Sequence, residues 1–263
     1  MAASLIAGLL GRGHPARCLR AADPVPDQRL ALTQAHGIAV FADNDQATKD
    51  ADVVVLAVKP QVLRTVCQGL AAAWAGQPTP LIISIAAGIR STDIQRWLGG
   101  QATVVRAMPN TPALLGAGAT ALYASSQVTI AQRQQAENIL QAAGVTVWLP
   151  QEDEMDLVTA LSGSGPAYFF LVMESLAAAA TELGLAADTA ALLTRQTALG
   201  AARMAIETGE DLPTLRRRVT SPGGTTECGV AALEQGQLRA LLKQTLVAAQ
   251  TRSKELAEQL GMD

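Results

Sequence analysis

The run DVVVLAV, residues 52–58, decides the fold of this chain. It is a nearly continuous β-branched and aliphatic stretch, which is typical of a strand buried on both faces of a sheet. The same character returns at Leu81–Ile85 and at Thr103–Arg106, and the segments between these strands, 61–74 and 91–98, have helical patterns. Such alternation indicates βαβ units and therefore a parallel sheet covered by helices on both faces.

The pattern continues on both sides of this region. Helices are expected at 2–11, 27–36 and near 130–143, and short strands at 17–21, Ala119–Ala124 and Val145–Leu149, the last two at the sheet edge. Ser91 is the expected N-cap of the helix over 91–98, because its hydroxyl can accept a hydrogen bond from a free N–H group.

After Pro150 the strand pattern stops. Helices are expected over Pro166–Leu183, from Asp188 to about Glu207, and from Leu238 onward, where apolar residues follow a helical period. We therefore predict an α/β domain with a parallel sheet over residues 1–150, followed by an all-α domain over residues 151–263.

The composition argues against several classes of protein. The formal net charge is −3, and the one basic run, Arg216-Arg217-Arg218, is interpreted as a solvated helix face, which disfavours nucleic acid as the main partner. Cys18, Cys67 and Cys228 show neither a disulfide framework nor metal-ligand spacing, so the sequence indicates a reducing, cytoplasmic location and no metal. No stretch qualifies as a membrane span.

Ligands of a doubly wound sheet bind beyond the carboxyl ends of its strands, and three loops stand at such ends here. The first strand runs into Lys59-Pro60-Gln61, the second into Ala86-Ala87-Gly88, and the third into 107–112. Small residues let a flat ring or a phosphate lie against the backbone, and Lys59 can meet a phosphate or a ribose hydroxyl. Each loop alone is also compatible with an ordinary βα turn, but together they favour a nucleotide site.

A second candidate site is the segment Val219–Gly236, VTSPGGTTECGVAALEQG, which has the pattern of a tight polar turn opening into a helix. Gly223 and Gly224 allow close approach to the backbone, and Thr225 and Thr226 suit a helix start. The free N–H groups and the positive end of the helix dipole favour a small anion such as a carboxylate. An ordinary helix start is the alternative reading of these features.

Four motifs, in order along the chain, resemble those of the pyrroline-5-carboxylate reductase family, and the likeness is closest to the form from pseudomonads. They are AVKPQ at Ala57–Gln61, VRAMPNTP at Val105–Pro112, LSGSGPAY at Leu161–Tyr168 and LPTLRRRVTSPGGTTECGVAALEQ at Leu212–Gln235. The resemblance implies a dinucleotide-binding, Rossmann-like first domain and a helical dimerisation and substrate domain. It also implies a homodimer that in many members assembles into a decamer. The implied reaction is hydride transfer from NADPH, or from NADH, to 1-pyrroline-5-carboxylate, which gives L-proline in the last step of proline biosynthesis.

The resemblance also assigns roles to individual residues. Cofactor contacts are expected at Met1, Asn44, Ala57, Val58, Lys59, Pro60, Ile85, Ala86, Ala87 and Asn110, and Arg218 falls where members have a further cofactor contact that is often a different residue. Substrate contacts are expected at Glu152, Ser221, Gly224, Thr225 and Thr226, with the Thr226 hydroxyl as the catalytic partner of the ring nitrogen.

The chain departs from the family pattern at its start. Members carry an opening strand and a Gly-x-Gly-Asn turn just before the methionine that matches Met1. Because that strand lies in the middle of the sheet, its absence is expected to leave a slot of about 9.6 Å lined by unpaired backbone groups. We therefore expect the native protein to start upstream, so that the transit-peptide appearance of residues 1–20 is a Rossmann helix and strand out of context.

Three further points stay open. Asp23 ends the second strand, where an acid favours a free ribose 2′-hydroxyl, whereas the family often uses NADPH. A hydroxyacid dehydrogenase shares the two-domain plan, but it uses a lysine of the helical domain as acid/base. The lysines of that domain here are only Lys243 and Lys254, late in the terminal helix, which disfavours this alternative. A third reading is a chain that keeps the dimerising helices without holding cofactor and acts as an assembly partner.

Overall fold

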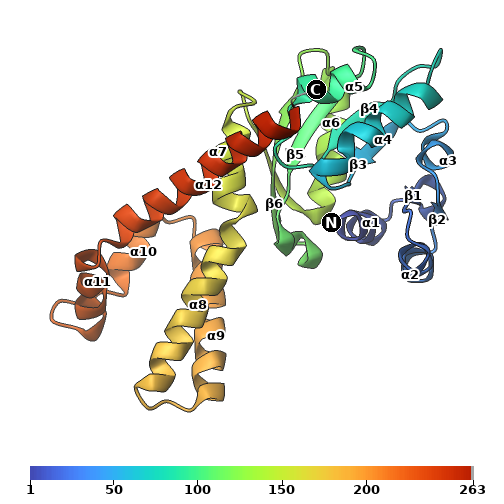
Figure 1. Cartoon of the computed structure of the whole chain (residues 1–263). Coiled ribbons are helices and arrows are strands. Elements are labelled where there is room, and N and C mark those ends of the chain that lie inside the picture. Colours follow the sequence, from blue (N-terminus) through green and yellow to red (C-terminus); the bar gives the residue numbers. More distant parts are fainter. Residues whose placement is uncertain (262–263) are drawn as a thin grey trace. The chain divides into compact units, whose positions relative to one another are not determined.

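The computed structural model describes residues 1–261, and these form two compact units. The first comprises Met1–Ser164 together with the chain from Ala248 onward, and the second is Gly165–Val247. The first unit contains all the strands, and the second is built from helices (Figure 1).

A five-stranded sheet forms the centre of the first unit. Its strands are β3 (Val53–Leu56), β4 (Leu81–Ser84), β5 (Val104–Met108), β6 (Gly118–Ala124) and β7 (Gly144–Trp148), in that order. The predicted parallel arrangement is confirmed for β3, β4 and β5, with Val54 opposite Ile82 and Ile82 opposite Val104. One correction concerns β6, which runs antiparallel to β5 and lies between β5 and β7, so that of the two strands predicted at the edge only β7 lies there.

Two short strands form a separate parallel sheet. They are β1 (Arg20–Ala22) and β2 (Ala39–Phe41), of which only the first is predicted from the sequence, because three residues are too few to show a pattern. Within residues 1–261, neither strand pairs with the five-stranded sheet.

Helices of the first unit match the expected positions closely. They are α1 (Ala2–Gly11), α2 (Pro26–His36), α3 (Asn44–Thr48), α4 (Pro60–Ala73), α5 (Ser91–Trp97), α6 (Ile130–Leu140) and α7 (Glu154–Val158), of which α3 and α7 were not predicted. The predicted cap at Ser91 is wrong: Arg90 is the N-cap of α5, and the Ser91 hydroxyl instead donates to Glu152.

Two hydrophobic clusters show that helices cover both faces of the sheet. One cluster joins Ile82 to Leu63 and Leu70 of α4, and the other joins Ile83 to Leu140 of α6. Consecutive strand residues point to opposite faces, so neighbouring positions of β4 enter different clusters. This burial on both faces explains why the predicted strands are almost continuously apolar.

The second unit is helical, as predicted. Its helices are α8 (Gly165–Glu182), α9 (Ala187–Glu207), α10 (Leu212–Arg218) and α11 (Thr225–Gln235), and α12 (Leu238–Gly261) starts in this unit. Large apolar side chains of α8 and α9 are exposed, among them Phe169, Phe170, Leu192 and Leu193. In the described part of the chain, none of the helices combines the length and the apolarity needed to span a membrane.

Candidate active site

The carboxyl ends of β3, β4 and β5 bring most of the predicted cofactor residues to one edge of the sheet. Leu56, Ser84 and Arg106 are register partners across the three parallel strands. The residues that follow them, including Ala57–Pro60, Ile85–Ala87 and Asn110, therefore share this edge, and the Ile85 N–H donates to the Leu56 carbonyl at 3.1 Å. Met1 and Asn44 belong to α1 and α3, outside the five-stranded sheet: Met1 is the N-cap of α1, and Asn44 opens α3.

Some side chains at this edge are buried in the core, and others are exposed. Ala86 belongs to a core cluster and is only 6% exposed, so its backbone rather than its side chain is available to a ligand. A Cβ on Gly88 would lie 3.6 Å from the Ala257 nitrogen, so Gly88 packs against α12. Lys59, by contrast, is exposed and has no ion-pair partner among residues 1–261, and it is the N-cap of α4 without a side-chain cap.

Glu152 is held by three hydrogen bonds within the first unit. Its Oε1 accepts from the Ser91 N–H at 2.7 Å and from Arg106 Nη1 at 2.8 Å, and its Oε2 accepts from the Ser91 hydroxyl at 2.8 Å. Ser91 and Arg106 were missed as partners of this acid. A single arginine inside an apolar strand is the signal that could have revealed the pair, because a buried charge needs an opposite one.

The glycine turn of the second unit has the expected form. Gly223 has a φ of 69°, in the left-handed region, and the Gly224 N–H donates to the Ser221 carbonyl at 3.0 Å. A Cβ on Gly224 would lie 2.5 Å from Ser221 Oγ and 3.0 Å from the Ser221 carbonyl oxygen, so a larger residue there would displace Ser221. Thr225 and Thr226 are the first two residues of α11, and both are exposed.

One residue of this turn was missed. Glu227 Oε2 accepts from the Gly223 N–H at 2.7 Å, so one amide of the predicted anion site already holds the chain's own carboxylate. An acid at the third helical position is half of a capping box, and that spacing was the available signal. The backbone N–H groups of Thr225 and Thr226, in the first turn of α11, have no helical partner.

Arg218 is exposed at the end of α10 and pairs with Glu210. Its neighbours Arg216 and Arg217 are exposed as well, which confirms that the basic run lies on a solvated part of a helix in this chain. Cofactor contact by Arg218 stays a prediction.

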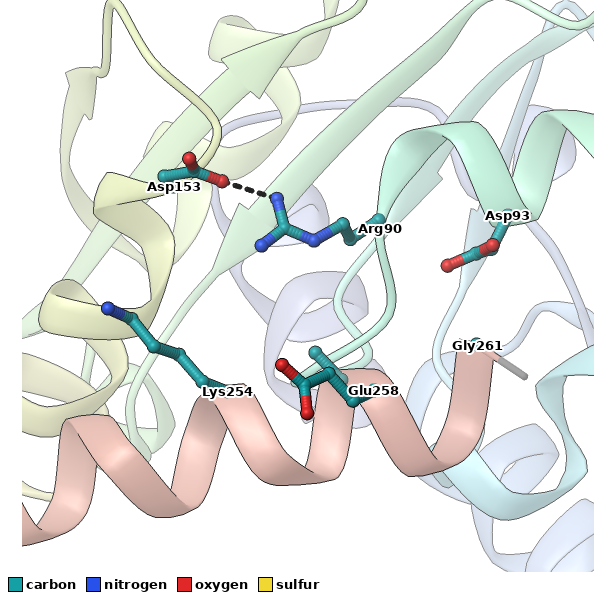
Figure 2. A pocket seen from close by; sticks show the side chains of 7 residues that line it. Arg90, Asp93, Asp153, Lys254, Glu258 and Gly261 are labelled. Atoms are coloured by element: carbon teal, nitrogen blue, oxygen red, sulfur yellow. Dashed lines mark hydrogen bonds and ion pairs between the residues drawn. The ribbon is translucent and has the colours of Figure 1, made fainter.

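A pocket of about 560 Å³ lies elsewhere in the first unit, beside the end of α12, and none of the predicted site residues lines it (Figure 2). Arg90 and Asp153 form a hydrogen-bonded ion pair there, which holds the pKa of the Asp153 carboxyl below its ordinary value and raises that of Arg90. Asp93 pairs with Arg96 at 3.0 Å, and Lys254 and Glu258 complete the charged lining. The pocket is thus lined mainly by charged side chains at the protein surface.

Two family models match the chain. Residues 152–256 match "Pyrroline-5-carboxylate reductase dimerisation", and residues 1–88 match "NADP oxidoreductase coenzyme F420-dependent". The first match identifies the helical part of the chain as a dimerisation domain.

Individual relatives give the same result. The pyrroline-5-carboxylate reductase of Pseudomonas aeruginosa is 52% identical over 261 residues, which cover 99% of this chain and 95% of the relative. The solved structure of a pyrroline-5-carboxylate reductase from Coxiella burnetii is 44% identical, with a TM-score of 0.93 over 97% of this chain and 94% of that one. The Plasmodium falciparum enzyme, solved with NADP bound, is 26% identical, with a TM-score of 0.83 over 97% of this chain and 93% of that one. The chain therefore belongs to the pyrroline-5-carboxylate reductase family.

Proposed function

We propose that this protein reduces 1-pyrroline-5-carboxylate to L-proline with NADPH, and that NADH serves as a second donor. The observation that carries the proposal is the 52% identity to the Pseudomonas aeruginosa enzyme over 99% of the chain. The hydroxyacid dehydrogenase alternative has no comparable support, and the helical domain's two lysines both lie in α12.

The edge formed by β3, β4 and β5 fits a dinucleotide. The Lys59 ammonium, which has no ion-pair partner among residues 1–261, suits a phosphate, and it lies at the start of α4, where the positive end of the helix dipole favours an anion. The backbones of Ala57, Val58 and Pro60 and of Ile85–Ala87 are the proposed lining for the rest of the cofactor, since small side chains there allow close approach. Met1, Asn44 and Arg218 are proposed as outer contacts.

The glycine turn suits the substrate carboxylate. The Gly223 N–H is already occupied by Glu227, so the amides of Thr225 and Thr226 are the ones left to bind an anion. Charge-assisted hydrogen bonds of this kind contribute about 1.5–3 kcal/mol each. Ser221 and Gly224 shape the turn, and Glu152 is proposed as a further substrate contact through the lone pairs that Ser91 and Arg106 leave free.

The chemistry asks little of the protein besides positioning. A bound reduced nicotinamide supplies a hydride for the imine carbon. Protonation of the ring nitrogen already activates the C=N bond, so a strong general acid is unnecessary, and we assign the Thr226 hydroxyl as hydrogen-bond partner of that nitrogen. Holding the ring in the reactive orientation accounts for several kcal/mol of barrier reduction, about 7 or more in well-oriented intramolecular reactions.

We further propose a division of roles at residue 150, with cofactor binding in 1–150 and dimerisation and substrate binding in 151–263. The exposed apolar side chains of α8 and α9 suit a homodimer, because such faces are costly in water. Assembly of dimers into a decamer and a cytoplasmic location complete the proposal.

The decisive experiment is a spectrophotometric assay of NADPH oxidation with 1-pyrroline-5-carboxylate, using the chain that begins at Met1 and ends at Asp263. We expect substrate-dependent oxidation and formation of proline. Cofactor oxidation with a hydroxyacid's oxo form instead would support the dehydrogenase reading. A folded oligomer that neither binds NADPH nor turns over would support the reading as a non-catalytic assembly partner.

A further inference from the structure

The turn that precedes α8 contains a carbonyl group without a helical donor. If the winding of α8 continued back to Ser162, the Ser162 carbonyl would accept from the N–H of the residue four positions later. That residue is Pro166, which has no N–H. A carbonyl left unpaired in a partly buried position costs free energy, so another donor is required.

This part of the chain is also wound differently from a normal helix. Residues Thr159–Gly163 form a π-helical turn, in which the Ser164 N–H donates to the Thr159 carbonyl at 2.8 Å. Gly163 faces the last residue of β5, because a Cβ there would lie 2.5 Å from Met108 Cε. Single π-turns within helices are often found at functional sites.

Asn110 supplies the missing donor. Its Nδ2 donates to the Ser162 carbonyl at 3.1 Å, and its Oδ1 accepts from the Ala119 N–H at 2.9 Å. The orientation of the amide is defined by this pair, since a carbonyl needs a donor and an N–H needs an acceptor. Both ends of the Asn110 side chain are thus engaged by the protein's own backbone.

We infer that Asn110 is a positioning residue whose amide replaces the N–H that Pro166 lacks and thereby holds the loop after β5 against the π-turn. This role rests on the proposed function, and it explains why the motifs VRAMPNTP and LSGSGPAY contact each other. Asn110 comes from the first motif, and Ser162, Gly163 and Pro166 come from the second.

The location of this contact gives it a consequence for catalysis. The loop that carries Asn110 follows β5 at the same edge as Ile85–Ala87, where the cofactor is proposed to bind. Ser162 lies two residues before Ser164, where the chain leaves the first unit. Loss of the bond frees the loop at this edge, and displacement of a binding group by about 1 Å can lower turnover by about 100-fold.

The test is a double-mutant cycle between Asn110→Ala and Pro166→Ala, measured as kcat/KM well below the melting temperature. Asn110→Ala is expected to lower kcat/KM by at least about tenfold and to raise the Kd of NADPH. Pro166→Ala restores a backbone N–H four residues after Ser162. The double variant is therefore expected to have a kcat/KM at least about threefold higher than that of Asn110→Ala. Direct contact between the Asn110 amide and the cofactor predicts no such recovery, so a double variant no better than Asn110→Ala overturns the inference.

Two additions keep the result clear. Asn110→Asp retains the acceptor for the Ala119 N–H and replaces the donor to Ser162 with a carboxylate oxygen, which the Ser162 carbonyl repels, and it covers the case in which Asn110→Ala does not fold. Asn138→Ala, at an exposed position of α6 where the amide oxygen accepts from Gln134, is the matched control and should leave kcat/KM unchanged. Hydrogen exchange of the Ala119 amide tests the contacts of Asn110 even if the chain shows no reductase activity. We expect faster exchange in Asn110→Ala than in the control. Equal exchange rates would contradict it.

Discussion

Arg106 Nη1 and Glu152 Oε1 lie 2.8 Å apart, with only 9% and 13% of their side chains exposed. The pair ties β5 to the loop between β7 and α7, and Ser91 adds the start of α5 through two hydrogen bonds to Glu152. Three segments around the proposed cofactor edge are therefore joined through a single carboxylate.

Replacing one partner of this pair should be costly. We expect Arg106→Met to lower the free energy of unfolding by about 3 kcal/mol, because the Glu152 carboxylate then lacks its counter-charge at a mostly buried position. Urea denaturation followed by circular dichroism measures the change. Arg203→Met removes an exposed pair with Glu207 and should cost less than about 0.5 kcal/mol. A similar small loss in both variants would mean that the buried pair adds nothing.

Thr226→Val should leave the fold intact and lower kcat/KM for 1-pyrroline-5-carboxylate by about 100-fold, since the hydroxyl proposed to meet the ring nitrogen is lost while the shape is kept. Thr33→Val, the same change at an exposed position of α2, serves as the control. Steady-state kinetics at saturating NADPH make the comparison, and unchanged turnover in Thr226→Val would exclude the assigned role.

Gly224→Ala tests the shape of the turn. The added methyl group would lie 2.5 Å from Ser221 Oγ and 3.0 Å from the Ser221 carbonyl oxygen, so the Ser221 side chain must rotate and the backbone of the turn must shift by a few tenths of an ångström. We expect KM for the substrate to rise about tenfold, because the amides of Thr225 and Thr226 move with it. Gly69→Ala, in α4 with no atom within 4 Å of the new methyl group, should leave KM unchanged and stabilise the helix by about 0.5–1 kcal/mol. An unaffected KM in Gly224→Ala would show that the turn is not part of the substrate site.

Asp23 should influence the choice between NADPH and NADH. It follows β1, and its Oδ1 accepts from the Val25 N–H at 2.8 Å, a bond that asparagine can keep. Asp23→Asn removes one negative charge from the place where a 2′-phosphate is expected. The ratio of kcat/KM for NADPH over NADH should therefore rise about tenfold, which corresponds to about 1.4 kcal/mol. Asp27→Asn, in the first turn of α2, is the control, and equal ratios in both variants would remove Asp23 from the ribose site.

Cys67 should be unreactive in the folded protein. Burial raises the pKa of its thiol from 9.0 to about 12, whereas Cys18 and Cys228 are exposed. At pH 8, a disulfide reagent should modify two thiols in the native state and three after unfolding. Since the pKa of Cys67 is raised in the folded state, its contribution to the free energy of unfolding is fully present below pH 9.0. That contribution is lost as the pH rises toward about 12, because the thiol of the unfolded chain ionises first. Cys67→Ala should weaken this decline, and rapid native labelling of three thiols would show that the site opens.

The local elements of this protein were determined largely by the sequence alone. The apolar run DVVVLAV, the strand Leu81–Ser84 and the long helix after Gly165 have patterns whose period reports directly on burial. The glycine turn before α11 was also predictable, because Gly223 adopts a conformation that other residues avoid. The family motifs added the identity of the reaction, which periodicity cannot supply.

The tertiary structure decided which distant groups meet. The antiparallel direction of β6 depends on pairing with β5, and a strand's own pattern is the same in either direction. Ser91, expected to cap its helix, instead donates to Glu152, 61 residues away. The amide of Asn110 donates to the carbonyl of Ser162, 52 residues away. Hydrogen bonds between side chains and remote backbone groups follow from the packing of whole elements, and no local pattern records them.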